Sequence, residues 1–507
     1  MKNTSAAYSP YALVRTCGLK VSFRLTDTGA AGDAVSSATG AGGLSQVQQT
    51  HDNVEALSAR YAGLELGGWI LDGGCKVAPN SVLGLQTGFW SAISLSDRSF
   101  EILPSLTYEF AHDHSSLGFT VFFVEDLYAE KMTVDVYELS GAKIGHAVVT
   151  VTGNVQAVDM PVSAYRRVVL TFPQSRKPLQ RIKIAEVVFG LVENFTASNV
   201  KSASITYEVS PTAQSLPSHE LNLTIDNTDK KFNVGSPNSL YSYLQQGQIL
   251  DTEIELGVPD GDMEPVSMGK FFYSSSKARP GEVMANIISN DPFIQLDKNT
   301  CKIGTEGAWT MEEAVVAVLT DSGLDITVSI PANIGTRVVN KCIPNTASHR
   351  EALRLIAQAA RCTCYFNRDS VLVFKDICVD VSVDELNDEN MYTPAGPEDT
   401  GRINTVALTV GSEVYTASNI ILGETIQPLS VYNPLAYNGA LVANWLLEKL
   451  QLRIGYSYIK ERGNPAREIS DTLTMEDYYS TRSDVVVVKE KYLFSAGLTC
   501  QTWAVRT

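Results

Sequence analysis

Hydrophobic and polar residues alternate along most of the chain, as they do in β-strands that bury one face. The alternation is clear at Phe119, Val121 and Phe123, and residues 168–172 add a run rich in β-branched side chains. Turn residues separate such runs. Residues 85–200 are therefore predicted to form a jelly-roll-like β-sandwich of about 100 residues.

The same alternation continues between residues 201 and 300. Glycine and proline residues mark the loops between its runs, and the segment is consistent with a small β-barrel. The predicted strands cover residues 204–209, 220–226, 252–257 and 268–274.

Residues 301–399 change to a helical period and are predicted to form an α/β module. Thr310 and Glu313 form a capping box, and the helix that they begin is expected to end near Ser322 and Gly323. A second box, Ser348 with Glu351, begins a helix, and a hairpin follows over residues 361–375. The second helix is expected to bury Ala352, Leu355, Ile356 and Ala359.

Strands return after residue 400, at 403–410, 413–421, 485–488 and 498–505, with one helix over residues 435–453. At the other end of the chain, residues 1–84 are expected to hold a strand near residues 13–25 and a flexible loop. The loop covers residues 28–50, whose small polar residues show no periodicity. Its role stays open.

Composition narrows the function classes. The 507 residues carry 40 Lys and Arg against 56 Asp and Glu, a net charge of -16. An acidic chain without a basic run argues against a specific nucleic-acid partner or binding to anionic lipid. No apolar run approaches the roughly 18–20 residues of a membrane helix, and no signal peptide is visible at the start. We therefore expect no direct membrane anchor, and synthesis and assembly in the cytoplasm.

Catalytic and cofactor motifs are missing from the sequence. There is no G-x-S-x-G, Walker A, H-E-x-x-H or dinucleotide G-x-G-x-x-G. We therefore expect no enzymatic activity and no cofactor, and we assign no catalytic, cofactor-binding or metal residues.

Several residue clusters could still bind a metal ion. Cys362 and Cys364 form a C-x-C with only His349 nearby, so buried free thiols are favoured over a metal site. His112 and His114 could offer two ligands, but a solvated turn is favoured. A calcium loop at Asp226, Asn227 and Asp229 fails the alternating spacing of such loops.

Carboxylates and aromatic residues leave two further interpretations. Glu476–Asp477 and Glu312–Glu313 could serve a glycosidase, although adjacent acids diverge and a solvated surface is favoured. Four aromatic residues could line a sugar-binding face, although burial in a core is favoured. They are Trp69, Phe89, Trp90 and Phe100.

Two groups of residues resemble a known family. The first is the stretch 202–211 with 216–217, 221–227 and 243–248, supported upstream by residues 64–73, 88–91 and 115–120. The second is Arg462-Gly463-Asn464-Pro465 with Glu468, residues 471–473 and residues 496–498, where Ala496 replaces a glycine usual in the family. Together they resemble baseplate tail hub proteins of phages and prophages of Gram-positive bacteria and of phage-tail-like bacteriocins.

The resemblance implies a mainly β, multidomain fold with an α/β insert. Two tail-tube-like β-barrels, at residues 201–300 and 400–507, would accompany the β-sandwich of the N-terminal half. It implies a homotrimeric ring in the particle's baseplate, joining the tail tube protein to spike or tail-tip proteins, with baseplate wedge and tape-measure proteins as further partners.

Two other functions remain as alternatives. A cell-wall glycan-binding tail adhesin would place Trp69 or Trp90 in an exposed groove. A cell-wall hydrolase would need a carboxyl group of raised pKa in a cleft. Contractile or non-contractile tail, phage or bacteriocin, and host range are not readable from the residues.

Overall fold

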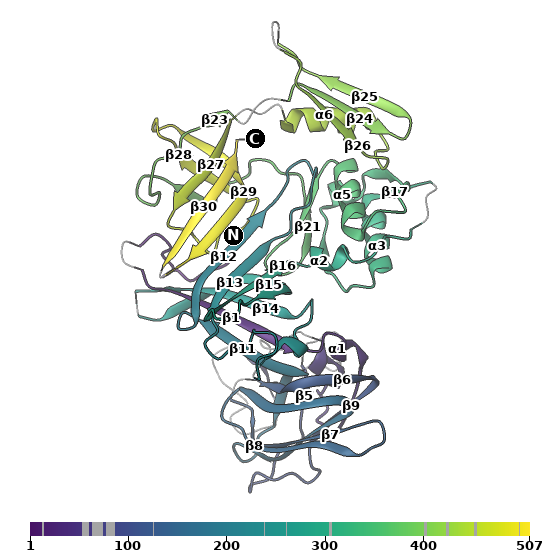
Figure 1. Cartoon of the computed structure of the whole chain (residues 1–507), viewed down its shortest axis with the longest axis vertical. Helices are drawn as coiled ribbons and strands as arrows, with labels where there is room; N and C mark the ends of the chain where they lie inside the picture. The colour runs from purple at the N-terminus through teal and green to yellow at the C-terminus, as the bar shows by residue number, and fades with distance from the viewer. Residues whose placement is uncertain are drawn as a thin grey trace. The chain divides into compact units, whose positions relative to one another are not determined.

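The computed structural model describes residues 1–12, 15–52, 60–62, 75–77, 87–124, 126–237, 239–259, 261–303, 307–399, 403–421, 425–450, 454–495 and 497–506. The chain divides into two compact units (Figure 1). The large unit comprises Met1–Val21, Phe195–Asn238 and Ile249–Thr507. The small unit comprises Ser22–Asn194 and Ser239–Gln248.

A 13-stranded sheet dominates the large unit, and two of its strands, β1 and β11, run across the boundary between the units. Its strands follow the order β11 (Gly190–Thr196), β1 (Cys17–Thr26), β14 (Ile249–Gly257), β15 (Met263–Lys277), β16 (Met284–Asn290), β13 (Glu220–Asp226), β12 (Val200–Glu208), β29 (Arg482–Phe494), β30 (Leu498–Val505), β27 (Ile454–Glu461) and β23 (Glu398–Asp399). β28 (Thr472–Glu476) pairs with β29 and with β22 (Asp384–Leu386).

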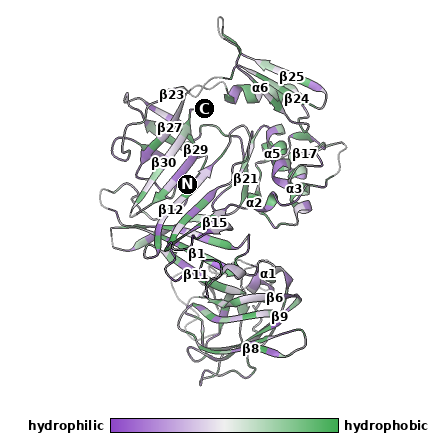
Figure 2. Ribbon diagram, viewed as in Figure 1, coloured by the Kyte–Doolittle hydropathy of each residue, from purple (hydrophilic) through white to green (hydrophobic). Residues whose placement is uncertain are grey.

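The alternation along these strands explains why they form. Leu221, Leu223 and Ile225 of β13 are fully buried, while Asn222 and Thr224 between them are partly exposed. Figure 2 shows hydrophilic and hydrophobic residues mixed along the strands of this sheet. The predicted mainly β fold is confirmed.

The two predicted barrels take another form. Strands β12 and β29 pair antiparallel, from Ala203 opposite Phe494 to Glu208 opposite Lys489. This pairing joins the strands of residues 201–290 and 454–505 into one sheet, and the described strands form no closed barrel. The reason is that β12 has two paired edges, and the second edge is satisfied by β29 rather than by a strand of its own segment.

Residues 405–450 were predicted to belong to the second barrel, but they do not join the large sheet. Their strands form a separate sheet in the order β25 (Glu413–Ser418), β24 (Thr405–Val410), β26 (Pro428–Tyr432), against which helix α6 (Gly439–Leu450) packs. Val406, Leu408 and Leu446 belong to the hydrophobic core that the preceding α/β segment forms. This part of the chain therefore completes the α/β module.

The rest of that module contains four helices and two small sheets among the described residues. The helices are α2 (Phe293–Leu296), α3 (Met311–Ser322), α4 (Ala332–Gly335) and α5 (His349–Ala359). The sheets are β17 (Ala308–Thr310) with β19 (Val338–Asn340), and β18 (Val328–Ser329), β21 (Leu372–Lys375), β20 (Thr363–Phe366). No helix in the described ranges is both long and apolar enough to cross a bilayer.

One of the two predicted capping boxes of the module is confirmed in full. Thr310 and Glu313 form a reciprocal capping box at α3, and Gly323 ends the helix with a φ of 68°. At α5, the Ser348 side chain accepts a hydrogen bond from the Glu351 backbone N–H, but the Glu351 side chain pairs with Arg354 and the second box is incomplete. The predicted inner face of α5 is buried.

The small unit contains a seven-stranded sheet. Its order is β5 (Phe89–Trp90), β10 (Lys183–Val188), β6 (Ser105–Phe123), β9 (Val155–Ser175), β7 (Ala129–Tyr137), β8 (Lys143–Thr150), with β2 (Ala34–Thr39) also paired with β6. The shorter elements are α1 (Ala30–Asp33), η1 (Val47–His51), η2 (Tyr241–Tyr243), β3 (Arg60–Ala62) and β4 (Cys75–Val77), of which β3 and β4 pair.

The predicted flexible loop at residues 28–50 is wrong. The segment contains α1, β2 and most of η1, and β2 pairs with β6 from Ala34 opposite Phe110 to Thr39 opposite Ser105. Ala30 is fully buried, and Ala34 and Ala38 pack against the core of this unit. The small side chains are ordered because a long neighbouring strand supplies the backbone partners.

Candidate functional site

The second group of family-like residues lies at a buried polar cluster of the large unit. Its centre is Arg467, which follows β27 and has no exposed side-chain surface. Its Nε donates to Glu490 Oε1 at 2.5 Å, its Nη2 donates to Glu461 Oε1, and the same Nη2 donates to Thr502 Oγ1 at 3.2 Å. A third carboxylate, Asp384 Oδ2, lies 3.5 Å from Nη1. One guanidinium thus connects four strands: β22, β27, β29 and β30.

The electrostatics of this cluster are those of a structural ion network. Burial alone lowers the pKa of Arg467, but the carboxylates of Glu461 and Glu490 raise the pKa well above its ordinary value. The guanidinium is therefore charged, and its hydrogen bonds occupy both fully buried carboxylates. A carboxylate held in this way is not free to act as an acid, a base or a nucleophile.

The Arg462-Gly463-Asn464-Pro465 turn holds the N-terminal segment. Arg462 Nη1 donates to the carbonyl oxygens of Tyr11 and Ala12, at 3.1 and 2.5 Å. In return, Arg15 Nη1 donates to Gly463 O at 2.8 Å. Gly463 has a φ of 84°, and a Cβ there would lie 2.9 Å from Cys500 Cβ, so the turn requires glycine.

Two tyrosines extend this attachment. Tyr8 Oη donates to Asn464 Oδ1 at 3.0 Å, and Tyr11 Oη donates to Asp384 Oδ2 at 2.6 Å. Asn464 Nδ2 also donates to Asp384 Oδ2, at 3.0 Å. The N-terminal segment is therefore tied to the same carboxylate that faces Arg467.

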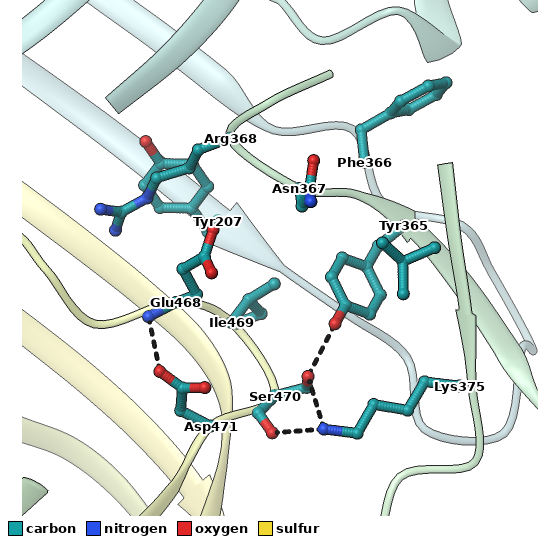
Figure 3. A pocket seen from close by; sticks show the side chains of 11 residues that line it. Tyr207, Tyr365, Phe366, Asn367, Arg368, Lys375, Glu468, Ile469, Ser470 and Asp471 are labelled. Carbon is teal, nitrogen blue, oxygen red and sulfur yellow. Dashed lines mark hydrogen bonds between the residues drawn. The ribbon is translucent and has the colours of Figure 1, made fainter. Parts of the chain in front are cut away.

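A small pocket of about 130 Å³ lies beside the cluster (Figure 3). The Tyr365 hydroxyl and the Lys375 amine converge on Ser470: Tyr365 Oη lies 2.7 Å from Ser470 Oγ, and Lys375 Nζ donates to Ser470 O at 3.2 Å. Buried Arg368 contributes its guanidinium, 4.8 Å from the Tyr207 ring centroid. With both acids and bases in its wall, including Asp471, the pocket suits ordered water rather than a charged ligand.

Sequence reasoning missed Arg467, although a signal was present. Glu490 has the same alternation parity as Tyr492 and Phe494 in β29, so it points to the buried face. A carboxylate on a buried face requires a cation or several donors. The alternation in β29 therefore predicts a buried partner for the Glu490 carboxylate, but it does not identify that partner as Arg467.

The histidine pair lies in strand β6, not in a solvated turn. His114 is buried, with Nδ1 3.0 Å from Asp27 Oδ2 and Nε2 2.9 Å from Asp33 Oδ2. His112 is exposed, and its Nδ1 lies 3.1 Å from Asp33 Oδ1. The expected turn is absent because β6 continues through these residues and pairs His114 with Tyr165 of β9.

The cysteines of the C-x-C are buried free thiols, as predicted. Burial raises the pKa of both Cys362 and Cys364, so both stay protonated at neutral pH. His349 lies instead 3.0 Å from Asp321 through its Nε2 atom. The structure therefore pairs His349 with Asp321.

The remaining acidic candidates have structural contacts. Asp226 accepts hydrogen bonds from the Thr228 backbone and hydroxyl, the first of which is 3.0 Å long. Glu313 caps α3, and Glu476 pairs with Arg482 at 3.1 Å. Asp477 accepts from the backbone N–H groups of Tyr479 and Thr481. Three further candidates complete these groups. Asn227 is buried and donates a hydrogen bond from its side chain to Asn233, whereas Asp229 and Glu312 are exposed.

The aromatic candidates are core residues where they are described. Phe89 is fully buried, Trp90 is 3% exposed, and Phe100 packs against the core of the small unit. The Trp90 indole donates to Thr87 O at 2.8 Å, and Lys183 Nζ lies 3.6 Å from the ring centroid, so the buried ring offers no open face to a sugar. Trp69 lies outside the described residues.

Comparisons with known proteins complete this description. No family model matches the sequence, and no curated protein matches it. Among solved structures, the chain is similar to a tail protein from Neisseria meningitidis MC58 (13% identity, 62% of this chain and 94% of that chain, TM-score 0.44). It is likewise similar to a 43 kDa tail protein of prophage MuSo2 from Shewanella oneidensis (13%, 62% and 95%, TM-score 0.45) and to prophage tail protein gp18 from Listeria monocytogenes EGD-e (12%, 62% and 91%, TM-score 0.40).

Proposed function

We propose that this chain is a structural component of the tail or baseplate of a phage-tail-like particle, and specifically a hub that forms a homotrimeric ring. The observation that carries the proposal is that the main stretches of both groups of family-like residues form or connect strands of one sheet. Residues 202–208 belong to β12, residues 221–226 to β13, and residues 462–471 to the connection between β27 and β28. The pairing of β12 with β29 connects them.

The polar residues of these groups serve packing rather than chemistry. Arg462 and Asn464 bind the N-terminal segment, and Arg467 holds two buried carboxylates. A part that transmits force between neighbouring proteins needs such rigid connections and no reactive group. We therefore assign the chain no catalytic step.

Surface aromatics of the large unit suit the ring contact. Tyr478 and Tyr479, beside β28, are 68% and 73% exposed, and Tyr392 and Tyr458 are also exposed. Tyrosine is enriched at the cores of protein interfaces. Obligate ring contacts bury about 2,000–5,000 Å², enough to cover such a group.

The position of a hub in the particle determines which proteins it would contact. A trimeric hub would contact the tail tube protein on one side and spike or tail-tip proteins on the other, with wedge and tape-measure proteins as further neighbours. The particle's baseplate would be its location. The net charge of -16 suits a channel that repels DNA during its passage.

Solution mass tests the proposal. Three chains of 55.1 kDa make a species of about 165 kDa, which native mass spectrometry distinguishes from the monomer. We expect replacement of both Tyr478 and Tyr479 by serine to shift the trimer toward monomer, because their burial is lost. Tyr432→Ser, at a 56% exposed tyrosine of a different sheet, is the matched control. A monomer at all protein concentrations, also with tube protein added, contradicts the ring.

A further inference from the structure

Three side chains of metal-binding type converge at one end of the α/β module. They are Cys301, Asp321 and His349, and their ligand atoms lie within 4.8 Å of one another. Cys301 lies between α2 and β17, Asp321 in the last turn of α3, and His349 at the first position of α5. Figure 1 shows α3 and α5 of this module, which pack against each other.

Backbone contacts hold the three positions together. An isolated bridge pairs Thr300 with Ser348, and the Cys301 N–H donates to Ala347 O at 2.9 Å. Asp321 Oδ2 accepts the Lys302 N–H at 2.8 Å and lies 3.0 Å from His349 Nε2. The residues before and after Cys301 are thus fastened to the other two elements, so the geometry does not depend on side-chain rotamers alone.

The environment favours a cation at this position. Cys301 and His349 are each 3% exposed, whereas the Asp321 side chain keeps 27% exposure and opens the cluster to solvent. A carboxylate in the last turn of a helix faces the negative end of the helix dipole, which is unfavourable without a compensating positive charge.

We propose that Cys301, Asp321 and His349 bind a divalent transition-metal ion, with Zn²⁺ as the best match. Thiolate, imidazole and carboxylate are the ligands of zinc sites, and three protein ligands leave a fourth position for water. A purely oxygen-ligated ion such as Ca²⁺ or Mg²⁺ does not suit sulfur and nitrogen ligands. The site is independent of the proposed tail role.

Binding would exchange a proton for the metal ion. Zinc binds cysteine as the thiolate, so the Cys301 thiol must lose its proton when the ion binds. The S–H bond breaks, the sulfur electron pair forms the metal–sulfur bond, and the proton leaves to solvent. Neither the metal nor the sulfur changes oxidation state. The bound ion would link α3, α5 and the segment before β17.

A second group of potential ligands is already occupied by an arginine side chain. Glu461, Glu490 and Cys500 also lie within 4.8 Å of one another. There, however, the guanidinium of Arg467 already binds both carboxylates. At Cys301, by contrast, the Asp321 carboxylate accepts the Lys302 backbone N–H and lies 3.0 Å from His349 Nε2.

The test uses the full-length chain, stripped of metal by a chelator and dialysed against Zn²⁺ or Co²⁺. We expect one equivalent of Zn²⁺ by elemental analysis, and a thiolate-to-cobalt charge-transfer band with Co²⁺. Cys301→Ser should abolish the band, and His349→Gln should lower Zn²⁺ affinity by at least about tenfold. Lys302→Gln should raise the affinity, because it removes a repelling charge.

Two control variants keep the experiment decisive. Cys342→Ser alters an exposed thiol of the same module, and Cys364→Ser alters a buried one outside the cluster. Both should retain the zinc and the band. Far-UV circular dichroism establishes that each variant is folded. Zinc retained in the double variant Cys301→Ser/His349→Gln, or a band that is lost only with Cys342 or Cys364, would overturn the site.

Discussion

A fully buried guanidinium is stable only where its donors meet acceptors, and Arg467 meets this condition with two carboxylates and a hydroxyl. Glu461 and Glu490 in turn depend on Arg467 for their charge compensation. Such a network contributes little net stability when intact but is costly to break from one side, because an unpaired buried charge remains. The network therefore makes residue 467 far less tolerant of change than an exposed arginine.

Arg467→Met should lower the free energy of unfolding by about 3–5 kcal/mol, because Glu461 and Glu490 would stay buried without a positively charged partner. Arg482→Gln is the control: this side chain is 59% exposed, pairs with Glu385 and Glu476, and should change stability by less than about 1 kcal/mol. Urea unfolding followed by tryptophan fluorescence measures both. Adding Glu461→Gln and Glu490→Gln should recover part of the loss, and equal midpoints for both single variants would refute the argument.

Asp33 should give the small unit an acid-dependent stability. The hydrogen bond from His114, followed by that from the His112 backbone, lowers the pKa of Asp33 from 3.8 to about 2. A lowered pKa in the folded state stabilises the fold above the unfolded value, and this contribution is lost as the pH falls from about 4 to 2. Asp27 also faces His114 and stays in place in the variant described next.

Thermal melting between pH 2 and 6 tests this expectation with Asp33→Asn. The difference in melting temperature between wild type and variant should be constant above about pH 5 and should shrink between pH 4 and 2. Asp97→Asn is a useful comparison, because Ser99 rather than a histidine lowers the pKa of Asp97. A difference that stays flat or widens below pH 4 would show that Asp33 titrates normally.

Helix α3 owes part of its stability to its first turn. Thr310 Oγ1 accepts the Glu313 N–H at 3.3 Å, and Glu313 Oε2 accepts the Thr310 N–H at 2.9 Å. Thr310→Ala should therefore cost about 1 kcal/mol and speed amide hydrogen exchange in the first turn. Thr320→Ala is the control: the Thr320 hydroxyl donates to the Val316 carbonyl within the helix, so its loss should change stability and exchange little. Similar exchange in both variants would contradict the capping argument.

Elements that local residues determine were predictable, and those that depend on distant partners were not. The Thr310 cap, the Gly323 end of α3 and the hairpin of β20 and β21 were read from short stretches of sequence. Strand β2 was missed because its small residues gain order only by pairing with β6, about 70 positions later. The same cause explains the barrels: no local pattern shows that β12 pairs with β29. Arg467 was missed because parity identifies buried Glu490 but not its partner.

The chain as a whole is built from two units with separate hydrophobic cores. One core includes Leu355 and other residues of the α/β module, and the other includes Leu170 and other residues of the seven-stranded sheet. The chain passes between the units several times, at Val21–Ser22, at Asn194–Phe195 and around residues 239–248. Each unit buries its own apolar surface, which is the physical condition for independent unfolding.

Scanning calorimetry of the full chain should therefore resolve two transitions rather than one. Leu170→Ala removes a fully buried side chain of the small unit and should destabilise that unit by about 2–5 kcal/mol, moving its transition alone. Leu355→Ala should move only the transition of the large unit, because Leu355 lies in the other core. The two variants act as controls for each other, since the chemical change is identical. A single transition that shifts in both would mean that the strands shared across the boundary, β1 and β11, couple the units into one cooperative fold.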